Sequence, residues 1–153
     1  MIRLSKETDY GIVLLTHLAA DPQRVSYSAR ELAQETHLPL PMVSKILKLL
    51  TRRDFLRSQR GVKGGYRLAR RPEKISVAEI ISAMEGPIAL TECVSAPGDC
   101  RHELLCPVRA NWQTISHAVR QALGGIALTD MARTSEPDWL PLEDKSTQIV
   151  SLQ

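Results

Sequence analysis

The chain has 153 residues, of which 43% are apolar and 4% aromatic, and its formal net charge is +3 at pH 7. This length allows one domain of ordinary size, or a small domain with an appendage, and it excludes several large domains. A core with so few aromatic side chains is typical of aliphatic packing between helices, and we predict a mainly α-helical protein.

The first apolar stretch of the chain, residues 11–20, is too short to cross a bilayer. The charged residues Lys6, Glu7 and Asp9 before it do not suit a secretory signal. We therefore expect a cytoplasmic protein with no membrane partner. The chain has three cysteines, and an odd number without an export signal favours reduced thiols over a disulfide framework.

The first half of the chain predicts three helices. The first runs from the N-cap Ser5 to about Ala20, and the second starts at Ser28, which forms a capping box with Glu31. The turn 38–41 leads into a third helix with separate inner and outer faces: Val43, Ile46, Leu47 and Leu50 inside, and Ser44, Lys45, Lys48, Thr51 and Arg52 outside. Two short helices with a tight turn indicate a helix-turn-helix.

A β-hairpin with a basic tip is predicted directly after the third helix. The extended stretches 55–60 and 66–69 flank the glycine-rich turn 61–65, which is typical of the wing of a winged helix-turn-helix. A loop that binds a nucleotide phosphate is an alternative, but no P-loop Lys-Ser or Lys-Thr pair follows the turn. Residues 45–74 hold eleven Lys and Arg and two acidic residues, a local charge of +9, so the remainder carries −6. This asymmetry indicates a face that binds a polyanion, although a solvated basic surface is the alternative.

The segment after the hairpin contains all three cysteines. A capping box of Ser76 with Glu79 predicts a helix over 77–85, and the following stretch 88–106 has no periodicity. It contains Cys93, Cys100 and Cys106. A loop of this length without secondary structure is uncommon in a compact domain and usually has a function, and binding a metal would be such a function.

The cysteine spacing, Cys-x6-Cys-x5-Cys, favours an iron–sulfur cluster. It is too wide for a zinc knuckle, whereas a polynuclear cluster accepts thiolates from points several ångströms apart. Cys106 comes just before Pro107 at a predicted helix N-terminus, where the helix dipole favours the thiolate. The alternatives are buried structural thiols, a redox-forming disulfide pair, and a zinc site completed by His102.

A heptad seam is predicted after the cysteines. Its apolar residues alternate at spacings of 4 and 3: Val108, Trp112, Ile115, Val119, Ala122 and Ile126. Pro107 suits the first position of this helix, which we expect to pair with its copy, although packing on its own domain is the alternative. The predicted organisation is a DNA-binding domain over 1–86, a cysteine-bearing loop over 87–106, a dimerisation helix region over 107–132 and a disordered tail over 133–153.

Three sequence features resemble the IscR/NsrR family of iron–sulfur winged-helix regulators. They are the N-terminal RLSKETDY at 3–10, the wing RGVKGGYRL at 60–68, and the cysteine trio followed by a dimer helix. The resemblance covers about residues 1–135, and the opening IRLSKETDYGIVLLTHLA is most similar to regulators of SUF-type iron–sulfur assembly operons. It implies a homodimer on a palindromic DNA operator, with the third helix in the major groove and the wing in the minor groove.

The resemblance also assigns the expected DNA contacts. Ser44 and Lys45 match the positions that face base edges, and Arg60 matches the wing arginine that enters the minor groove. Charge and helix face indicate three phosphate contacts: Lys48, Arg52 and Lys63.

The resemblance implies a [2Fe-2S] or [4Fe-4S] cluster held by the three cysteines. The IscR branch takes its fourth ligand from a histidine three residues after the last cysteine, where this chain has Arg109, which cannot bind iron. The NsrR branch uses an aspartate of the first helix from across the dimer, and Asp9 stands at the matching place. We expect Asp9 of the partner subunit as fourth ligand; an ordinary first-helix carboxylate is the alternative, and His102 is the next candidate.

These features predict a transcription regulator that responds to cluster supply, iron or oxidative stress, not an enzyme, and with no small-molecule substrate. A metal-free regulator that senses thiol oxidation is one alternative. A redox or electron-transfer protein is another, but no nucleophile–base constellation or Cys-x2-Cys site supports it.

Overall fold

Local capping interactions set the starts of the first two helices in the computed structural model, which describes residues 3–133. Helix α1 (Lys6–Ala20) begins after Ser5, whose side-chain oxygen accepts a hydrogen bond from the Thr8 backbone N–H. Helix α2 (Ala29–Thr36) begins with the predicted capping box of Ser28 and Glu31. Helix α3 (Leu40–Arg52) follows a tight turn. The predicted helix-turn-helix is confirmed.

The core of the body lies between α1, α2, α3 and the elements that follow them. The four residues of α3 that were predicted to face inward are all buried. They pack with other fully buried aliphatic side chains, among them Leu14, Leu15, Leu32, Ile75 and Ile80. Burial of each such side chain contributes about 1.5–3 kcal/mol, so an aliphatic core suffices without many aromatic residues.

The wing is a two-stranded antiparallel sheet of β1 (Leu56–Gln59) and β2 (Gly65–Leu68). Leu56 lies opposite Leu68 at its base, and Leu56 is buried in the core. The loop between α1 and α2 joins the sheet through an isolated bridge: Tyr27 donates to the Tyr66 carbonyl at 3.0 Å, and Tyr66 donates to the Tyr27 carbonyl at 2.7 Å. The wing is thus held to the body by buried Leu56 of its first strand and by the bridge from Tyr27 to its second strand.

The cysteine segment contains more secondary structure than its sequence predicts. A 3-10 turn (Pro72–Lys74) and helix α4 (Val77–Glu85), with its predicted capping box, precede it. Within the stretch 88–106, α5 (Glu92–Ser95) and a second 3-10 turn (Glu103–Leu105) form. The prediction for Pro107 was wrong: α6 (Arg109–Gly124) starts two residues later, with Val108 as its N-cap, and Pro107 lies in the turn before it.

The chain returns to the body after α6. Helix α7 (Leu128–Ala132) packs against α1, and Leu128 is fully buried. The return is fixed by two backbone hydrogen bonds, from Val77 to the Ile126 carbonyl at 2.9 Å and from Leu128 to the Ile75 carbonyl at 2.8 Å. The range 107–132 therefore contains an arm helix and a separate helix of the body. Almost all of the predicted tail, residues 134–153, lies outside the described residues.

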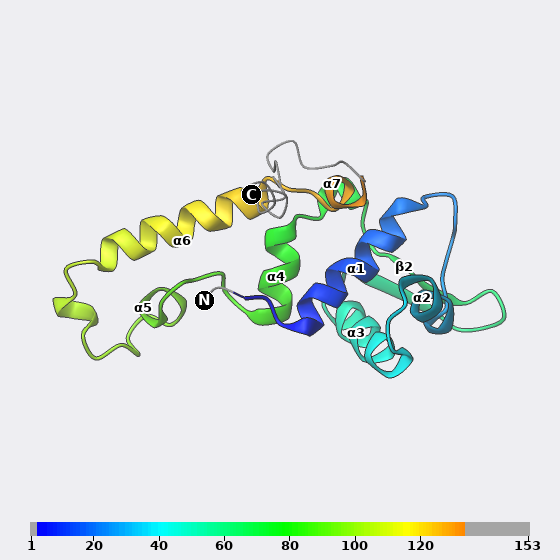
Figure 1. Ribbon diagram of the computed structural model, residues 1–153, viewed down its shortest axis with the longest axis horizontal. Helices are drawn as coiled ribbons and strands as arrows, with labels where there is room; N and C mark the ends of the chain where they lie inside the picture. The colour runs from blue at the N-terminus through cyan, green and yellow to red at the C-terminus, as the bar shows by residue number, and fades with distance from the viewer. Residues whose placement is uncertain (1–2, 134–153) are drawn as a thin grey trace, which may run out of the picture.

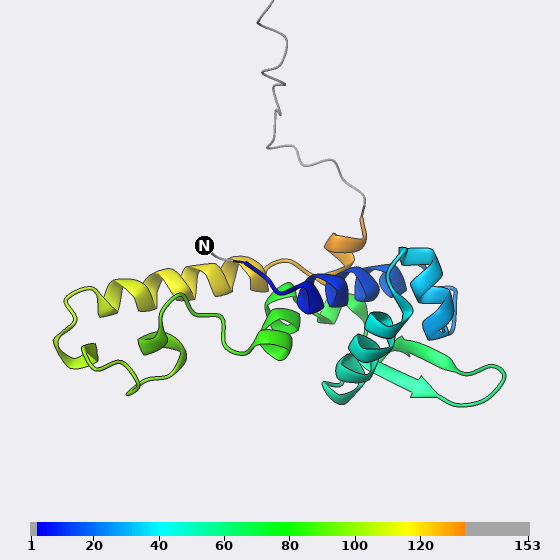
Figure 2. The ribbon, with the colours of Figure 1, turned by 60° about the horizontal axis from the view of Figure 1, so that its bottom comes forward.

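Helix α6 and the cysteine segment form an arm that extends from α4, away from α3 and the wing (Figures 1 and 2). The two halves of the arm are joined at Ser116, which is fully buried and accepts a hydrogen bond from the Leu90 backbone N–H at 3.2 Å. The predicted seam faces solvent in the single chain: Trp112 and Ile115 of α6, with Val108 just before the helix and Ile126 just after it, are 36–46% exposed. No helix within residues 3–133 is long and apolar enough to span a bilayer.

Candidate DNA-binding face and cysteine segment

Helix α3 presents its polar face to solvent. Lys45, Lys48 and Arg52 are exposed and Ser44 is half-buried, opposite the face that packs in the core. Lys45 forms an ion pair with Glu7 of α1. Both side chains are more than a third exposed, so the pair contributes little to stability.

The wing places a second set of basic side chains beside α3. Figure 2 shows α3 and the hairpin extending from the same side of the body. Arg60 and Lys63 are exposed in the turn, and Val62 between them is fully exposed. The Gly64 N–H donates to the Gly61 carbonyl at 2.9 Å and closes the turn. The six predicted DNA-contact residues therefore lie on two neighbouring elements.

Two further arginines of the basic segment lie outside the predicted set of DNA contacts. Arg57 of β1 lies directly opposite Arg67 of β2, and both are exposed. Like charges that face each other across two strands are destabilising, unless an anion lies between them. The predicted pairing of the strands about the turn could have revealed this register, since residues equidistant from residue 62 face each other.

We expect Arg67→Gln to have opposite effects on stability and on DNA binding. Relief of the repulsion from Arg57 should raise the free energy of unfolding by a few tenths of a kcal/mol, measured by urea denaturation. Loss of a phosphate contact should weaken duplex binding severalfold and reduce the salt slope by about 0.9, measured by fluorescence anisotropy. Arg120→Gln on α6 is the matched control. If both variants bind DNA equally well, Arg67 makes no phosphate contact.

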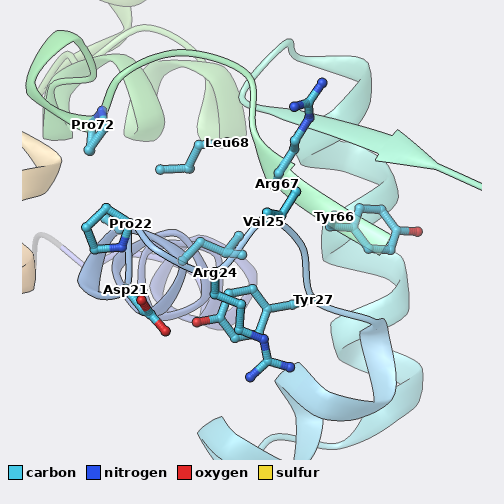
Figure 3. A pocket seen from close by; sticks show the side chains of 11 residues that line it. Asp21, Pro22, Arg24, Val25, Tyr27, Tyr66, Arg67, Leu68 and Pro72 are labelled. Carbon is cyan, nitrogen blue, oxygen red and sulfur yellow. The ribbon is translucent and has the colours of Figure 1, made fainter. Parts of the chain in front are cut away.

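The junction between the body and the wing is braced by a polar network around a small pocket of about 190 Å³ (Figure 3). The Arg24 guanidinium lies 3.9 Å from the centre of the Tyr27 ring. It donates to Glu31 at 2.6 Å and to Glu35 at 3.0 Å. Burial raises the pKa of Tyr27. Because Tyr27 also pairs with β2 and Glu31 caps α2, the network fixes the wing relative to the helix-turn-helix.

The three cysteines are free thiols in different surroundings. Cys93 lies on α5 and is only 6% exposed, with its sulfur 3.3 Å from the Thr91 hydroxyl. Cys100 and Cys106 are half-buried and flank the second 3-10 turn. Cys93 therefore belongs to a short helix, whereas the sequence predicts that all three thiols lie in a loop.

A buried carboxylate holds the segment in this conformation. Glu103, between Cys100 and Cys106, is 7% exposed. It accepts a hydrogen bond from the Gly98 backbone N–H at 2.6 Å and forms an ion pair with Arg109. Arg109, which the sequence identified only as a residue unable to bind iron, thus clamps the end of the cysteine segment to α6. No local sequence signal predicted this pair.

The donor chemistry of the segment suits an iron–sulfur cluster, because three free thiols lie on one short piece of chain. Their present geometry does not assemble the site. Within residues 3–133, no three Cys, His, Asp or Glu side chains form a group that could hold a metal ion. Asp9 is exposed on α1, and His102 is exposed in the segment. Ligation by all three thiolates would require the segment to change conformation.

The helix-turn-helix, the hairpin and the basic face define a winged-helix DNA-binding protein. The profile of the Rrf2 family, described as iron-dependent transcriptional regulators, matches residues 4–134. The chain belongs to the Rrf2 family.

Individual relatives agree with this assignment. The HTH-type transcriptional regulator IscR of Xenorhabdus nematophila is 26% identical over 135 residues, which cover 88% of this chain and 82% of IscR. The structure of CymR, the global cysteine regulator of Bacillus subtilis, is similar with a TM-score of 0.70 at 27% identity, over 89% of this chain and all of CymR. An oxidized form of Staphylococcus aureus CymR gives a TM-score of 0.67 at 26% identity over the same shares. These relatives are transcriptional regulators, and the chain is a regulator rather than an enzyme.

Proposed function

We propose that this protein is a homodimeric regulator that binds a palindromic operator and senses iron–sulfur cluster status through Cys93, Cys100 and Cys106. A SUF-type cluster assembly operon is the proposed target. The observation that carries the proposal is the presence of three free thiols on the segment that joins the DNA-binding body to α6. The iron-dependent description of the family and the similarity to IscR support it.

The arm supports the dimeric part of the proposal. Trp112, Ile115 and Ile126 form an apolar seam that faces solvent in the single chain, as expected of a helix that pairs with its copy. Helix α6 has 16 residues and is about 24 Å long. Half-sites on a palindromic operator lie about 34 Å apart, a spacing that the two recognition helices of the proposed dimer would have to match.

The proposed DNA contacts divide by element. Ser44 and Lys45 of α3 would face base edges, with phosphates held by the exposed cations beside them: Lys48, Arg52 and Lys63. Arg60 at the wing tip would enter the minor groove. Because Lys45 is paired with Glu7 in the structure, DNA binding exchanges this ion pair for a contact to the operator.

A chain of contacts links the cysteine segment to α3. Glu85, the last residue of α4 before the segment, accepts a hydrogen bond from the Ser5 backbone N–H at 2.6 Å. This bond lowers the pKa of Glu85. Ser5 is the N-cap of α1, and Glu7 in the first turn of α1 holds Lys45. A change in the segment that moves Glu85 can therefore shift α1 and the recognition helix together.

When bound, an iron–sulfur cluster would supply a cross-link between the thiolates that is sensitive to oxygen and to iron supply. The thiolates of Cys93, Cys100 and Cys106 would hold it, and because they form no metal-binding group within residues 3–133, the segment would have to change conformation to bring them together. Asp9 of the partner subunit is the proposed fourth ligand, which would tie α1 of one subunit to the segment of the other.

The experiment that tests the proposal is purification without oxygen, with iron and sulfide measured per subunit and visible absorption recorded. We expect an iron- and sulfide-containing, coloured dimer whose affinity for operator DNA changes when the cluster is removed. A preparation free of iron that still responds normally to oxidative stress contradicts the proposal.

Direct thiol sensing is the second candidate, favoured by the half-buried Cys100 and Cys106 and by the similarity to CymR, of which one structure is an oxidized form. In that case a colourless protein changes its DNA affinity on treatment with an oxidant, and a reductant reverses the change. Metal content and reversal by a reductant together separate the two candidates.

Glu85→Gln tests the contact chain. The neutral amide is a weaker acceptor for the Ser5 N–H, so we expect folding and cluster content to be kept while the ratio of DNA affinities with and without cluster falls toward one. Operator titrations of both forms give the ratio. Glu73→Gln, an exposed carboxylate of the 3-10 turn before α4, is the control. An unchanged ratio for Glu85→Gln means that coupling takes another route.

A further inference from the structure

The outer face of the wing carries two arginines side by side. Successive residues of a strand point to opposite faces of a sheet. Leu56 of β1 is buried in the core, so the next residue, Arg57, is on the face toward solvent. Arg67 of β2 lies directly opposite Arg57 and is also exposed. Its side chain points away from the Tyr27 ring at the junction with the body (Figure 3). Two cations therefore stand next to each other on an exposed surface.

This pair lacks the counter-charge that neighbouring arginines have. In the part of the chain that the structure describes, neither arginine forms an ion pair with a carboxylate. Just beyond β2, Arg70 pairs with Glu79 at 3.1 Å. Arg71 pairs with Glu73 at 3.4 Å. Because like charges directly opposite on antiparallel strands are destabilising, an anion between the two wing arginines would stabilise the hairpin.

An open hollow beside the pair has room for such an anion. Its volume is about 500 Å³, and its lining includes Arg57, Arg67, Ser58 and Gln59. A guanidinium group presents a planar fork of N–H donors that matches the oxygens of a phosphate, and the bonds to such an anion are charge-assisted. The serine hydroxyl and the glutamine amide can donate further, neutral hydrogen bonds. The donor set of the hollow therefore suits a phosphate group.

The position of the pair along the hairpin favours a phosphate of the DNA backbone. Arg57 stands three residues before Arg60, a distance of about 10 Å along an extended strand. The minor groove is about 7.5 Å deep. When Arg60 enters that groove, as proposed above, a residue about 10 Å back along the strand stands near the level of the phosphates on the groove's rim.

We propose that Arg57 and Arg67 together hold one phosphate of the DNA backbone. This site adds to the six contacts of the proposed function, and it rests on that function for the placement of the wing tip in DNA. The bound phosphate would neutralise the repulsion between the two strands, so the hairpin is more stable on DNA than in the free protein. A phosphate contact positions the wing without reading a base, so its contribution to affinity is the same for any DNA sequence.

A double-mutant cycle in the full chain without cluster tests whether one phosphate is shared. Arg57→Gln, Arg67→Gln and their combination are titrated with duplex DNA at several salt concentrations by fluorescence anisotropy. Each single change should weaken binding severalfold, and the combination should weaken it by less than the product of the two effects. Loss of one shared phosphate reduces the salt slope of the combined variant by about 0.9, whereas loss of two separate phosphates reduces it by about 1.8.

The matched control is Arg101→Gln combined with Arg120→Gln. It removes the same charge from exposed positions of the arm, away from α3 and the wing, and should leave the salt slope unaltered. Urea denaturation of the DNA-free protein adds an independent measurement. Each single change in the wing relieves the same repulsion, so the combined wing variant should be no more stable than either single variant.

Inorganic phosphate separates a free ion from the DNA backbone as the ligand. Unfolding is measured in phosphate and in chloride at equal ionic strength. If phosphate stabilises the wild type but not the combined wing variant, while both bind DNA equally, the site takes a free phosphate and the proposal is overturned. A slope change near 1.8, or wing variants that bind DNA like the wild type, also overturns it. A wild type that binds no duplex defeats the proposed function as well, whereas normal binding by every variant defeats only the phosphate site.

Discussion

Replacement of Gly65 by alanine is expected to detach the wing from the body. Gly65 has φ of +145°, and a Cβ there would lie 2.6 Å from the Tyr27 carbonyl oxygen and 2.8 Å from its carbon. Both are backbone atoms that cannot rotate away, so the two hydrogen bonds between Tyr27 and Tyr66 must break. We expect the free energy of unfolding to fall by roughly 2–5 kcal/mol, from two lost hydrogen bonds and backbone strain.

The same change should weaken duplex DNA binding about a hundredfold, because Arg60 and Lys63 lose their fixed position and each contact contributes roughly 1–3 kcal/mol. Urea denaturation and anisotropy titrations measure the two effects. Gly61→Ala is the control: its φ is also positive, at +113°, but a Cβ there meets no atom within 4 Å. Gly61→Ala therefore introduces backbone strain from the positive φ but no steric clash. Equal losses from the two variants would show that the contact with Tyr27 is not what requires glycine at position 65.

Features that depend on neighbours in the sequence were predictable. The capping boxes at Ser28 and Ser76 join residues three apart, and both are present in the structure. The inner face of α3 follows from helical spacing alone, and all four of its predicted residues are buried. The hairpin follows from two extended stretches about a glycine-rich turn. In each case the signal and the structure lie within about ten residues of each other.

Features that depend on tertiary contacts were not predictable. Helix α7 is too short to be recognised, and Leu128 is buried because α1 and Ile75 meet it from distant parts of the chain. The Lys45–Glu7 pair joins residues 38 positions apart. Lys45, which the sequence predicts as a DNA contact, therefore forms an ion pair with α1 in the free protein. The clamp of Glu103 and Arg109 depends on how the segment folds back on α6. The assignments of DNA contacts and cluster ligands stay predictions.

Replacement of Cys100 by alanine is expected to abolish the cluster and leave the folded dimer intact. Thiolates are the ligands that iron–sulfur clusters require, and only three are available per chain. Cys100 is half-buried at the edge of the second 3-10 turn, apart from the main core cluster, so the free energy of unfolding of the cluster-free protein should change by less than about 1 kcal/mol. Iron and sulfide should fall from full occupancy to near zero, and operator affinity should equal that of the cluster-free wild type.

His102→Ala in the same turn is the matched control, because it removes an exposed side chain that could also bind a metal. Retention of the cluster there, with its loss in Cys100→Ala, assigns the thiolate as ligand and excludes zinc completed by His102. The reverse pattern would move the metal site to the histidine. Full iron and sulfide in Cys100→Ala would leave two thiolates and outside ligands to hold the cluster. The segment would then have no need to bring all three thiolates together, and the proposed link from the cysteines to the recognition helix would lose its cause.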